Sequence, residues 1–344
     1  MGTVADSPAT MSPATEPTDA ETEPTTVAIA CQGGGSHTAF TAGVLRELLA
    51  NWDSDGESFE LVGISGTSGG AFNALAVWYG LVTADAATAI ELLDRIWSDI
   101  AATDPVDRLV NSWLTGYSWL DSTGAPMPAI SPYYMTGDEW AQRRLARVLE
   151  RHIDFEAIPE LTGETQPELV VGAIDIEGGR FETFTNAGVT VEAVLASAAV
   201  PRWFEAVEVE GGRYWDGLLS QNPPITDLLS VPGDRTPEEL WVIQVNPQRR
   251  AGLPTALSEI DDRRNELAGN ISLNQELRFA EWINDKLDSG HFEHPDYRQV
   301  DIKRLELSDY PYATKVNRSK RFLDRLTAEG EARAAAFLDD RSAR

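Results

Sequence analysis

The sequence predicts an α/β fold built on a mostly parallel sheet with crossover helices. A short apolar strand at residues 27–31 ends in three glycines, and apolar side chains at helical spacing follow over 37–50. The same order recurs at once, with a strand at 61–64, a tight turn at 65–70 and an apolar helix at 71–81. Two consecutive units of strand, turn and helix are typical of a parallel sheet.

Less regular sequence follows these two units. A further helix is predicted to run from Thr83, which can cap it, to Ile100. Residues 104–136 are apolar, with Trp113 and Trp119 among them, but they have neither helical nor strand periodicity. This segment could be a cap over an apolar pocket, or its aromatic side chains could simply pack on the core.

The second half of the chain continues the alternation of strands and helices. A charged amphipathic helix is predicted near residues 138–153, and the end of the chain is mostly helical. The last helix, within about 313–338, is expected to dock on the core. Strands are predicted at 169–174, 181–184, 214–215, 240–245 and 300–307.

The composition indicates one large globular domain. The chain has 344 residues, of which 42% are apolar and 24% charged, close to the averages for soluble proteins. Residues 1–26 are rich in Thr, Pro, Ala, Ser and Glu and have almost none of the large apolar side chains that an ordered segment needs. We therefore expect a disordered acidic tail at 1–26 and a single folded domain at 27–344.

The charge balance is strongly acidic. With 55 Asp and Glu against 28 Lys and Arg, the net charge is −27. Such a surface repels the phosphates of nucleic acids and anionic lipid headgroups, so no nucleic-acid partner is expected. Salt screens self-repulsion of this size, which favours a halophilic protein over a merely acidic cytosolic one.

Several absences bear on compartment and cofactors. Cys31 is the single cysteine, so the chain can form no internal disulfide and nothing points to an oxidising compartment. The sequence has neither a run of about eighteen apolar residues nor a secretion signal, and a cytoplasmic protein without a transmembrane segment is expected. No group of His, Cys or carboxylate residues has the spacing of metal ligands, and no metal or organic cofactor is implied.

Residues 66–70, Gly-Thr-Ser-Gly-Gly, have the pattern Gly-x-Ser-x-Gly between a predicted strand and a predicted helix. In this context a sharp turn exposes the serine oxygen above the sheet, and the glycines leave room for the substrate. The N-terminus of the following helix adds N–H groups and a dipole that favour developing negative charge. The motif therefore predicts Ser68 as a nucleophile.

A second glycine-rich loop, Gly33, Gly34 and Gly35, follows the first predicted strand. Neighbouring parallel strands end at the same edge of a sheet, so this loop can face Ser68. Its backbone N–H groups could then stabilise the oxyanion of an acyl-transfer reaction. A phosphate-binding loop is disfavoured, because the sequence lacks the pattern Gly-x-x-x-x-Gly-Lys and has no lysine nearby.

A nucleophilic serine needs a base, and neither glycine-rich loop supplies one. His291 or His294 could complete a Ser-Asp-His triad, but both lie in a polar stretch at 288–294 that looks like a solvated loop. Carboxylates are the better candidates for this base.

The chain resembles the patatin-like phospholipases, a family that uses a Ser-Asp dyad in place of a triad. Three motifs match in order: the glycine triplet at 33–35, the serine motif at 66–70 and the Asp-Gly pair at 216–217. The segment 196–201, small residues ending in proline, and the Asn-Pro pair at 222–223 also fit. The resemblance covers about residues 27–250.

One departure from the family concerns the oxyanion loop. The family usually has Arg or Lys two residues after the glycines and then Gly, whereas this chain has His37 and Thr38. Backbone N–H groups do not depend on those side chains, so the expected oxyanion hole remains Gly33, Gly34 and Gly35.

The resemblance implies a three-layer patatin-like fold, with helices on both faces of the sheet, and a covalent mechanism. Asp216 would accept the proton of Ser68, Ser68 would attack an ester carbonyl, and water would release the acyl-enzyme. Asp175, which ends another predicted strand, could compete for the role of base. It is interpreted as structural, because no Asp-Gly pair accompanies it.

The function predicted from these features is a serine acyl hydrolase that cleaves ester bonds of lipids, such as phospholipids, glycolipids or neutral esters. The expected partner is thus a lipid or other ester substrate, met at a membrane or granule surface. Two alternatives stay open: an intracellular polyester depolymerase of the polyhydroxyalkanoate type, and a catalytically silent lipid-binding module. The presence of both dyad residues disfavours the silent module.

Overall fold

The computed structural model describes residues 24–54, 57–122, 131–134, 138–201, 203–230, 235–250, 252–255, 257–291 and 297–342. The strands are β1 (Thr25–Cys31), β2 (Asp53–Ser54), β3 (Glu57–Gly66), β4 (Glu168–Asp175), β5 (Arg180–Thr185), β6 (Val207–Val209), β7 (Gly212–Asp216), β8 (Glu239–Gln244) and β9 (Asp301–Glu306). The α-helices are α1 (Ala39–Ala50), α2 (Gly69–Thr83), α3 (Ala86–Ile100), α4 (Pro105–Ser122), α5 (Asp138–His152), α6 (Ile158–Leu161), α7 (Val191–Ser197), α8 (Thr226–Leu229), α9 (Leu257–Asp288) and α10 (Lys320–Ser342). Short 3-10 helices are η1 (Gly35–Thr38), η2 (Pro132–Tyr134), η3 (Asn186–Gly188), η4 (Gly217–Leu219) and η5 (Tyr312–Val316).

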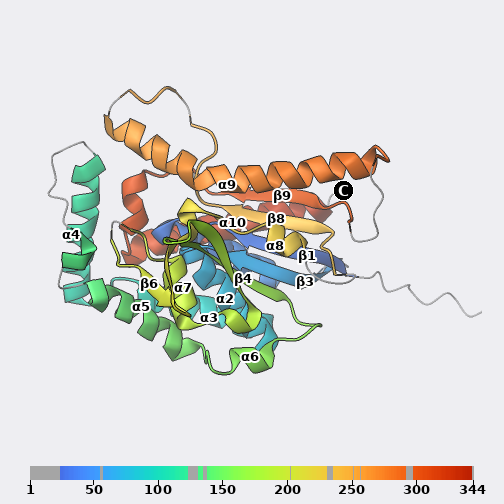
Figure 1. Cartoon of the computed structure of the whole chain (residues 1–344), viewed down its shortest axis with the longest axis horizontal. Coiled ribbons are helices and arrows are strands. Elements are labelled where there is room, and N and C mark those ends of the chain that lie inside the picture. The colour runs from blue at the N-terminus through green and yellow to red at the C-terminus, as the bar shows by residue number, and fades with distance from the viewer. Residues whose placement is uncertain are drawn as a thin grey trace, which may run out of the picture.

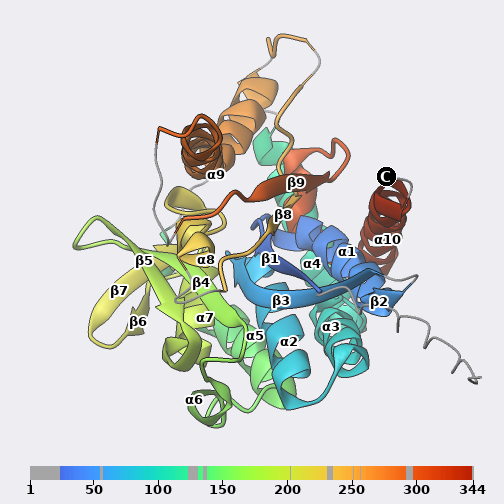
Figure 2. The ribbon, with the colours of Figure 1, turned by 90° about the vertical axis from the view of Figure 1, so that its right-hand side faces the viewer.

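Within these described ranges the strands form one nine-stranded sheet, whose main order is β6-β7-β4-β3-β1-β8-β9. The strands from β4 to β9 in this order are parallel to their neighbours, whereas β5, β6 and β7 add antiparallel pairs beside β4. Figures 1 and 2 show the resulting twisted sheet. The prediction of a mostly parallel central sheet is confirmed.

Helices cover both faces of the sheet, as Figure 2 shows. Alternate residues of β1 separate the two layers, because successive side chains of a strand point to opposite faces. Val27, Ile29 and Cys31 belong to the large core under α1, α2, α3 and α10, whereas Ala28 and Ala30 pack toward α8 and α9. These five β1 side chains are almost fully buried, which confirms the three-layer α/β architecture.

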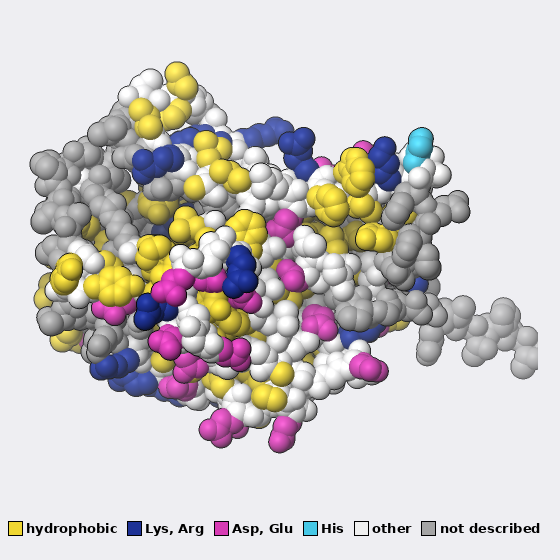
Figure 3. Space-filling model, viewed as in Figure 1, with side chains coloured by type: hydrophobic (Ala, Val, Ile, Leu, Met, Phe, Trp, Pro, Cys, Tyr) yellow, Lys and Arg dark blue, Asp and Glu magenta, His cyan; other side chains and the backbone are white. Residues whose placement is uncertain are grey.

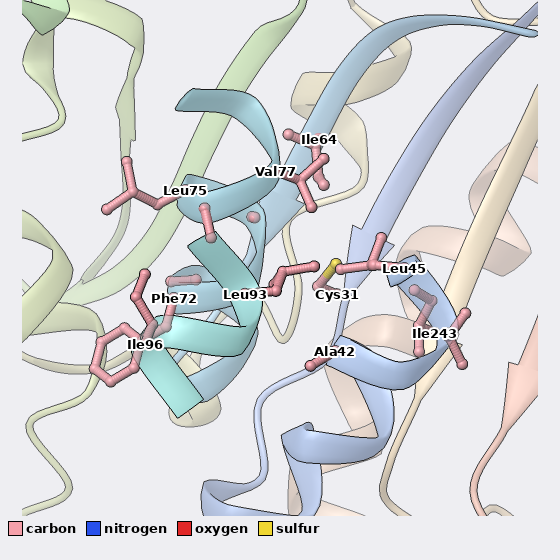
Figure 4. Packing of buried hydrophobic residues seen from close by; sticks show 14 of the residues in the cluster. Cys31, Ala42, Leu45, Ile64, Phe72, Leu75, Val77, Leu93, Ile96 and Ile243 are labelled. Atoms are coloured by element: carbon pink, nitrogen blue, oxygen red, sulfur yellow. The ribbon is translucent and has the colours of Figure 1, made fainter. Parts of the chain in front are cut away.

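Cys31 lies in the middle of the larger core, among side chains such as Leu45, Leu93 and Ile243 (Figure 4). Its side chain is fully buried, and burial raises the pKa of the thiol far above its ordinary value. In the described part of the chain, no helix is both long and apolar enough to cross a membrane.

The cap of α3 differs from the prediction. Thr83 is the last residue of α2, where its hydroxyl donates to the backbone oxygen of Tyr79 (2.6 Å). The cap is Asp85, whose backbone is extended and whose carboxylate accepts the N–H of Thr88 (2.8 Å). The prediction that Thr83 caps this helix was therefore wrong. Asp85 lies at the position where a side-chain acceptor satisfies a free N–H group of the first helical turn.

The expectation of irregular structure at 104–136 was also wrong in part, since α4 occupies Pro105–Ser122. Asp104 accepts the N–H of Asp107 (2.9 Å), and proline fits the first helical position. Several large apolar side chains of α4 are exposed: Val106, Leu109, Trp113, Trp119 and Leu120. Residues 123–130 and 135–136 lie outside the described residues.

The N-terminal tail predicted at 1–26 falls almost wholly outside the described residues. Its last two residues, Thr25 and Thr26, belong to β1 and pair with Phe59 and Glu60 of β3. The strand therefore starts two residues earlier than the apolar pattern indicated, because the threonines continue the parallel ladder.

Candidate active site

The ends of three parallel strands bring the predicted site together at one edge of the sheet. Cys31 of β1 pairs with Gly66 of β3 on one side and with Ile243 of β8 on the other. The glycine-rich loop therefore follows β1 beside the serine turn that follows β3. This is the edge at which ligands bind in open α/β sheets.

Ser68 occupies a sharp turn between β3 and α2. Its backbone has φ 56° and ψ −129°, a conformation that non-glycine residues rarely adopt, and its side chain is mostly buried. Ser197 of α7 braces the turn, since its hydroxyl accepts the N–H of Ser68 (2.9 Å) and donates to the oxygen of Gly172 (2.7 Å). Such strain persists only where surrounding contacts hold it, as Ser197 does here.

Asp216 ends β7 and is fully buried. It pairs with Ala173 of the antiparallel neighbour β4, and its Oδ1 accepts the N–H of Leu218 (2.8 Å). The following Gly217 has no room for a side chain, because a Cβ there would lie 2.5 Å from the oxygen of Gly172. The Asp-Gly pair is thus required by the close approach of η4 to β4.

Burial raises the pKa of Asp216 from its ordinary 3.8 to about 7. The N–H of Leu218, the hydroxyl of Ser68 and the positive charge of Lys315 act in the opposite direction. Ser68 is thus near enough to influence the carboxyl group, but Oδ2 of Asp216 has no hydrogen bond of regular geometry to any residue in the described ranges. Catalytic hydrogen bonds are often long before substrate binds and shorten in the complex.

The glycine-rich loop lies directly against the serine turn. A Cβ on Gly33 would lie 2.5 Å from the oxygen of Thr67 and 2.9 Å from Cβ of Ser68. The N–H of Gly33 is donated to Oδ1 of Asn222 (2.7 Å), so it is engaged inside the protein and does not match the predicted oxyanion role. For Gly34 and Gly35, no hydrogen bond from the N–H is found among the residues that the structure describes.

A buried group of amide side chains supports this loop from below. Asn222 follows η4, and Asn246 follows β8 and donates to the backbone oxygen of Gly33 (3.2 Å). Gln32 accepts the N–H of Asn246 (2.9 Å) and donates to Oδ1 of Asn270 on α9 (2.8 Å). All four amides are almost fully buried, so each needs these partners.

His37 and Thr38, where the chain departs from the family pattern, hold the loop by contacts of their own. His37 is buried and its Nε2 lies 2.7 Å from Oγ1 of Thr314. Burial, and then the charge of Lys315, lower the pKa of His37 well below its ordinary value, so the imidazole is neutral. Thr38 donates its hydroxyl to the oxygen of Gly35 (2.7 Å).

The rival bases lie in other surroundings. Asp175 closes the turn between β4 and β5, where it accepts the N–H of Gly178 (2.8 Å) and pairs with Arg180 (3.3 Å). Those contacts, the Gly178 bond foremost, hold the pKa of Asp175 below its ordinary value. His291, beyond the end of α9, is exposed, and its Nδ1 lies 2.7 Å from Oγ of Ser289. His294 lies outside the described residues.

Three supporting residues of the site were not predicted from the sequence. Ser197 was noted only within a small-residue segment, while Asn246 and Lys315 were not singled out. Asn246 had a usable signal, because polar residues that follow a buried parallel strand lie at the ligand-binding edge. Lys315 had none, since it lies on η5, near the end of the chain.

Large apolar side chains are exposed around this edge and along α9. Besides those of α4 they include Leu219, Ile260, Leu267, Ile271, Phe279 and Trp282. Helix α4 packs against η5, and η5 packs against η1 beside the glycine-rich loop. Figure 3 shows hydrophobic side chains interspersed with acidic ones over the face that it presents.

Comparison with known families decides the assignment. The model of the family described as patatin-like phospholipase matches residues 29–229. The chain belongs to the patatin-like phospholipase family. The matched range contains Ser68, Asp216 and the glycine triplet, and membership implies a lipid acyl hydrolase. Asn246 and Lys315 lie beyond the range that the family model matches.

Two solved structures similar to this family member are both 14% identical to it. VipD from Legionella pneumophila has a TM-score of 0.38, with 90% of this chain and 67% of VipD covered. ExoU from Pseudomonas aeruginosa, in its complex with SpcU from the type III secretion system, has a TM-score of 0.32. That likeness covers 91% of this chain and 52% of ExoU, so the chain spans about half of ExoU. No curated protein gives a significant match.

Proposed function

We propose that this protein is a serine acyl hydrolase that cleaves carboxylic ester bonds of lipids, with Ser68 as nucleophile and Asp216 as base. The observation that carries the proposal is that Ser68, in a strained turn, lies close to the fully buried carboxyl group of Asp216. The pKa of about 7 for Asp216 adds support, because a general base is most effective when its pKa is near the working pH.

The reaction follows from these two groups. Asp216 accepts the hydroxyl proton while Oγ of Ser68 attacks the ester carbonyl carbon, and the carbonyl oxygen becomes an oxyanion. When the C–O bond of the ester breaks, the departing alcohol takes the proton from Asp216 and the acyl group stays on Ser68. Water then attacks the acyl-enzyme and gives a proton to Asp216. Asp216 passes this proton to Oγ of Ser68 as the bond between the acyl carbon and Oγ breaks, which releases the carboxylic acid and regenerates both residues.

We assign oxyanion stabilisation to the N–H groups of Gly34 and Gly35 and to the N-terminus of α2. Gly33 serves the loop in another way, because its N–H is held by Asn222. Losing one oxyanion donor typically lowers kcat by about 100-fold or more. The contact of Asn222 with Gly33 should therefore matter through the orientation of the next two peptide groups.

A lipid substrate is supported by the surroundings of the site as well as by the family. Trp113, Trp119 and Leu120 of α4 are exposed on an element that packs against η5 beside the loop. Aromatic and aliphatic side chains of this kind favour contact with lipid at a membrane or granule surface. The net charge of −27 favours neutral or zwitterionic lipid over anionic lipid.

The two alternatives make different demands on the same site. A polyester depolymerase uses the same dyad and would differ only in the pocket that holds the acyl chain. A catalytically silent lipid-binding module would have no need of a strained serine beside a buried carboxyl group, and strain of this kind is rarely kept without a use.

The test is covalent labelling combined with hydrolysis. Ser68→Ala should lose fluorophosphonate labelling and all hydrolysis of phospholipid, triacylglycerol and short-chain esters, with the melting temperature nearly unchanged. Ser65→Ala is the matched control, since Ser65 is also buried and its hydroxyl only donates to the oxygen of Pro224 (2.5 Å). Labelling of a serine other than Ser68 would refute the proposal, and cleavage of polyhydroxyalkanoate alone would select the depolymerase.

A further inference from the structure

A lysine from the far end of the chain lies against the oxyanion loop. Lys315 is on η5, and its backbone oxygen packs so closely on Gly35 that any Cβ there would collide with it. Gly35 also has φ +59°, a backbone conformation that favours glycine. The loop and Lys315 therefore fit together only because residue 35 is a glycine.

Contacts with Asn246 and Tyr312 hold the ammonium group of Lys315 in place. Its Nζ donates to Oδ1 of Asn246, and Asn246 in turn donates to the oxygen of Gly33 (3.2 Å). Its Nζ also lies 4.7 Å from the ring centroid of Tyr312, a cation–π distance. The positive charge is thus fixed on a chain of contacts that leads directly to the glycine-rich loop.

The charge of Lys315 acts on both titratable groups nearest the loop. It lowers the pKa of Asp216 and also that of His37. Groups from several elements face it: His37 of η1, Asp216 at the end of β7 and Tyr312 of η5. Helix α4, which also packs on η5, carries Asp107, whose carboxylate is neutralised by ion pairs with Arg144 and Arg318.

We propose that Lys315 is a positioning residue that supplies, from the C-terminal part of the chain, the positive charge this oxyanion loop lacks. The side chain two residues after the glycines is a buried, neutral imidazole and cannot supply it. A fixed cation beside the site favours the ionised form of Asp216 and the oxyanion that forms on the substrate. This inference rests on the proposed hydrolase function.

The experiment measures kcat/KM and the rate of fluorophosphonate labelling from pH 5 to pH 9 for Lys315→Met and Lys315→Arg. Lys320→Met is the control, because Lys320 is exposed and forms a surface ion pair with Asp324, one turn further along α10. Lys315→Met should lose about tenfold in kcat/KM at pH 7, less than the loss of a direct oxyanion donor. Its acid limb should move to higher pH, because Asp216 without the cation needs a higher pH to ionise.

The expected pattern is therefore a deficit in Lys315→Met that is large at pH 6 and smaller at pH 9. Lys315→Arg should follow the pH profile of the parent, since it keeps the charge, and Lys320→Met should be unchanged. An equal deficit at pH 6 and pH 9 would mean that the charge does not act on Asp216 and would overturn the inference. An arginine variant with the methionine profile would also overturn it, because the lost packing and not the charge would then account for the deficit. A parent without labelling or hydrolysis would instead remove the proposed function itself.

Discussion

Replacing Asp216 by asparagine should inactivate the enzyme and at the same time stabilise it. Asparagine has nearly the same shape and can still accept the N–H of Leu218 through its amide oxygen, but it can neither ionise nor take a proton. The rate of ester hydrolysis should fall to a small fraction of the parent's, because Ser68 loses its base. The gain in stability follows from the burial of Asp216, which penalises the carboxylate.

The magnitude can be worked out from the pKa of Asp216. In the unfolded chain the group has a pKa near 3.8, and in the folded protein about 7, so the folded state holds a proton between these values that the unfolded state has lost. A group with a raised pKa stabilises the fold at low pH, and that stability is lost as the pH rises to 7. Above pH 7 the burial of the ionised carboxylate lowers the free energy of unfolding by about 4 kcal/mol, and Asp216→Asn removes this penalty because asparagine does not ionise.

Unfolding by urea or heat at pH 4, 6 and 8 measures this difference between variant and parent. The free energy of unfolding of Asp216→Asn should equal that of the parent at pH 4 and exceed it increasingly toward pH 8. At pH 8 the difference corresponds to roughly 5 °C in melting temperature for a chain of this size. Asp175→Asn is the matched control with the opposite sign, because hydrogen bonds hold the pKa of Asp175 below 3.8 and its loss should destabilise at pH 8. An advantage that does not vary with pH would refute the reasoning.

Two further predictions concern the histidines and the salt response. The double variant His291→Ala plus His294→Ala should keep its esterase activity within a few-fold of the parent. If this double variant were inactive while Asp216→Asn remained active, the result would favour a Ser-Asp-His triad instead. The melting temperature should rise with ionic strength, because salt screens the net charge of −27. Circular dichroism across a salt titration checks this, and a constant melting temperature would remove the halophilic interpretation.

The fold was largely predictable because its central strands are short apolar runs that end in glycine-rich turns. The units at 27–50 and 61–81 have the alternation of strand and helix that few other folds produce. Helix α4 was missed although Val106, Leu109 and Trp113 recur at helical spacing, because several Pro and Gly residues of 104–136 lie around them. The short β6 gave no signal either, since it has only three residues.

The site was predictable only as far as local motifs reach. Ser68 and the glycine triplet each lie in one short segment, whereas the role of Gly33 depends on Asn222, 189 residues away in the sequence. The loop itself therefore could not reveal that its first N–H group is already engaged. The contact of Lys315 with the loop is of the same kind, because only the folded chain brings η5 onto Gly35.

The burial of Cys31 makes the chain its own reporter of folding. The thiol lies in the centre of the larger core and its raised pKa keeps it protonated, so an alkylating reagent can reach and modify it only after the core opens. A serine-directed reagent, by contrast, is expected to react with Ser68 only while the site at the sheet edge is intact. Two covalent reactions on the same molecule thus report different states. Labelling of the active-site serine reports the folded protein, and alkylation of Cys31 reports the rate at which the core opens.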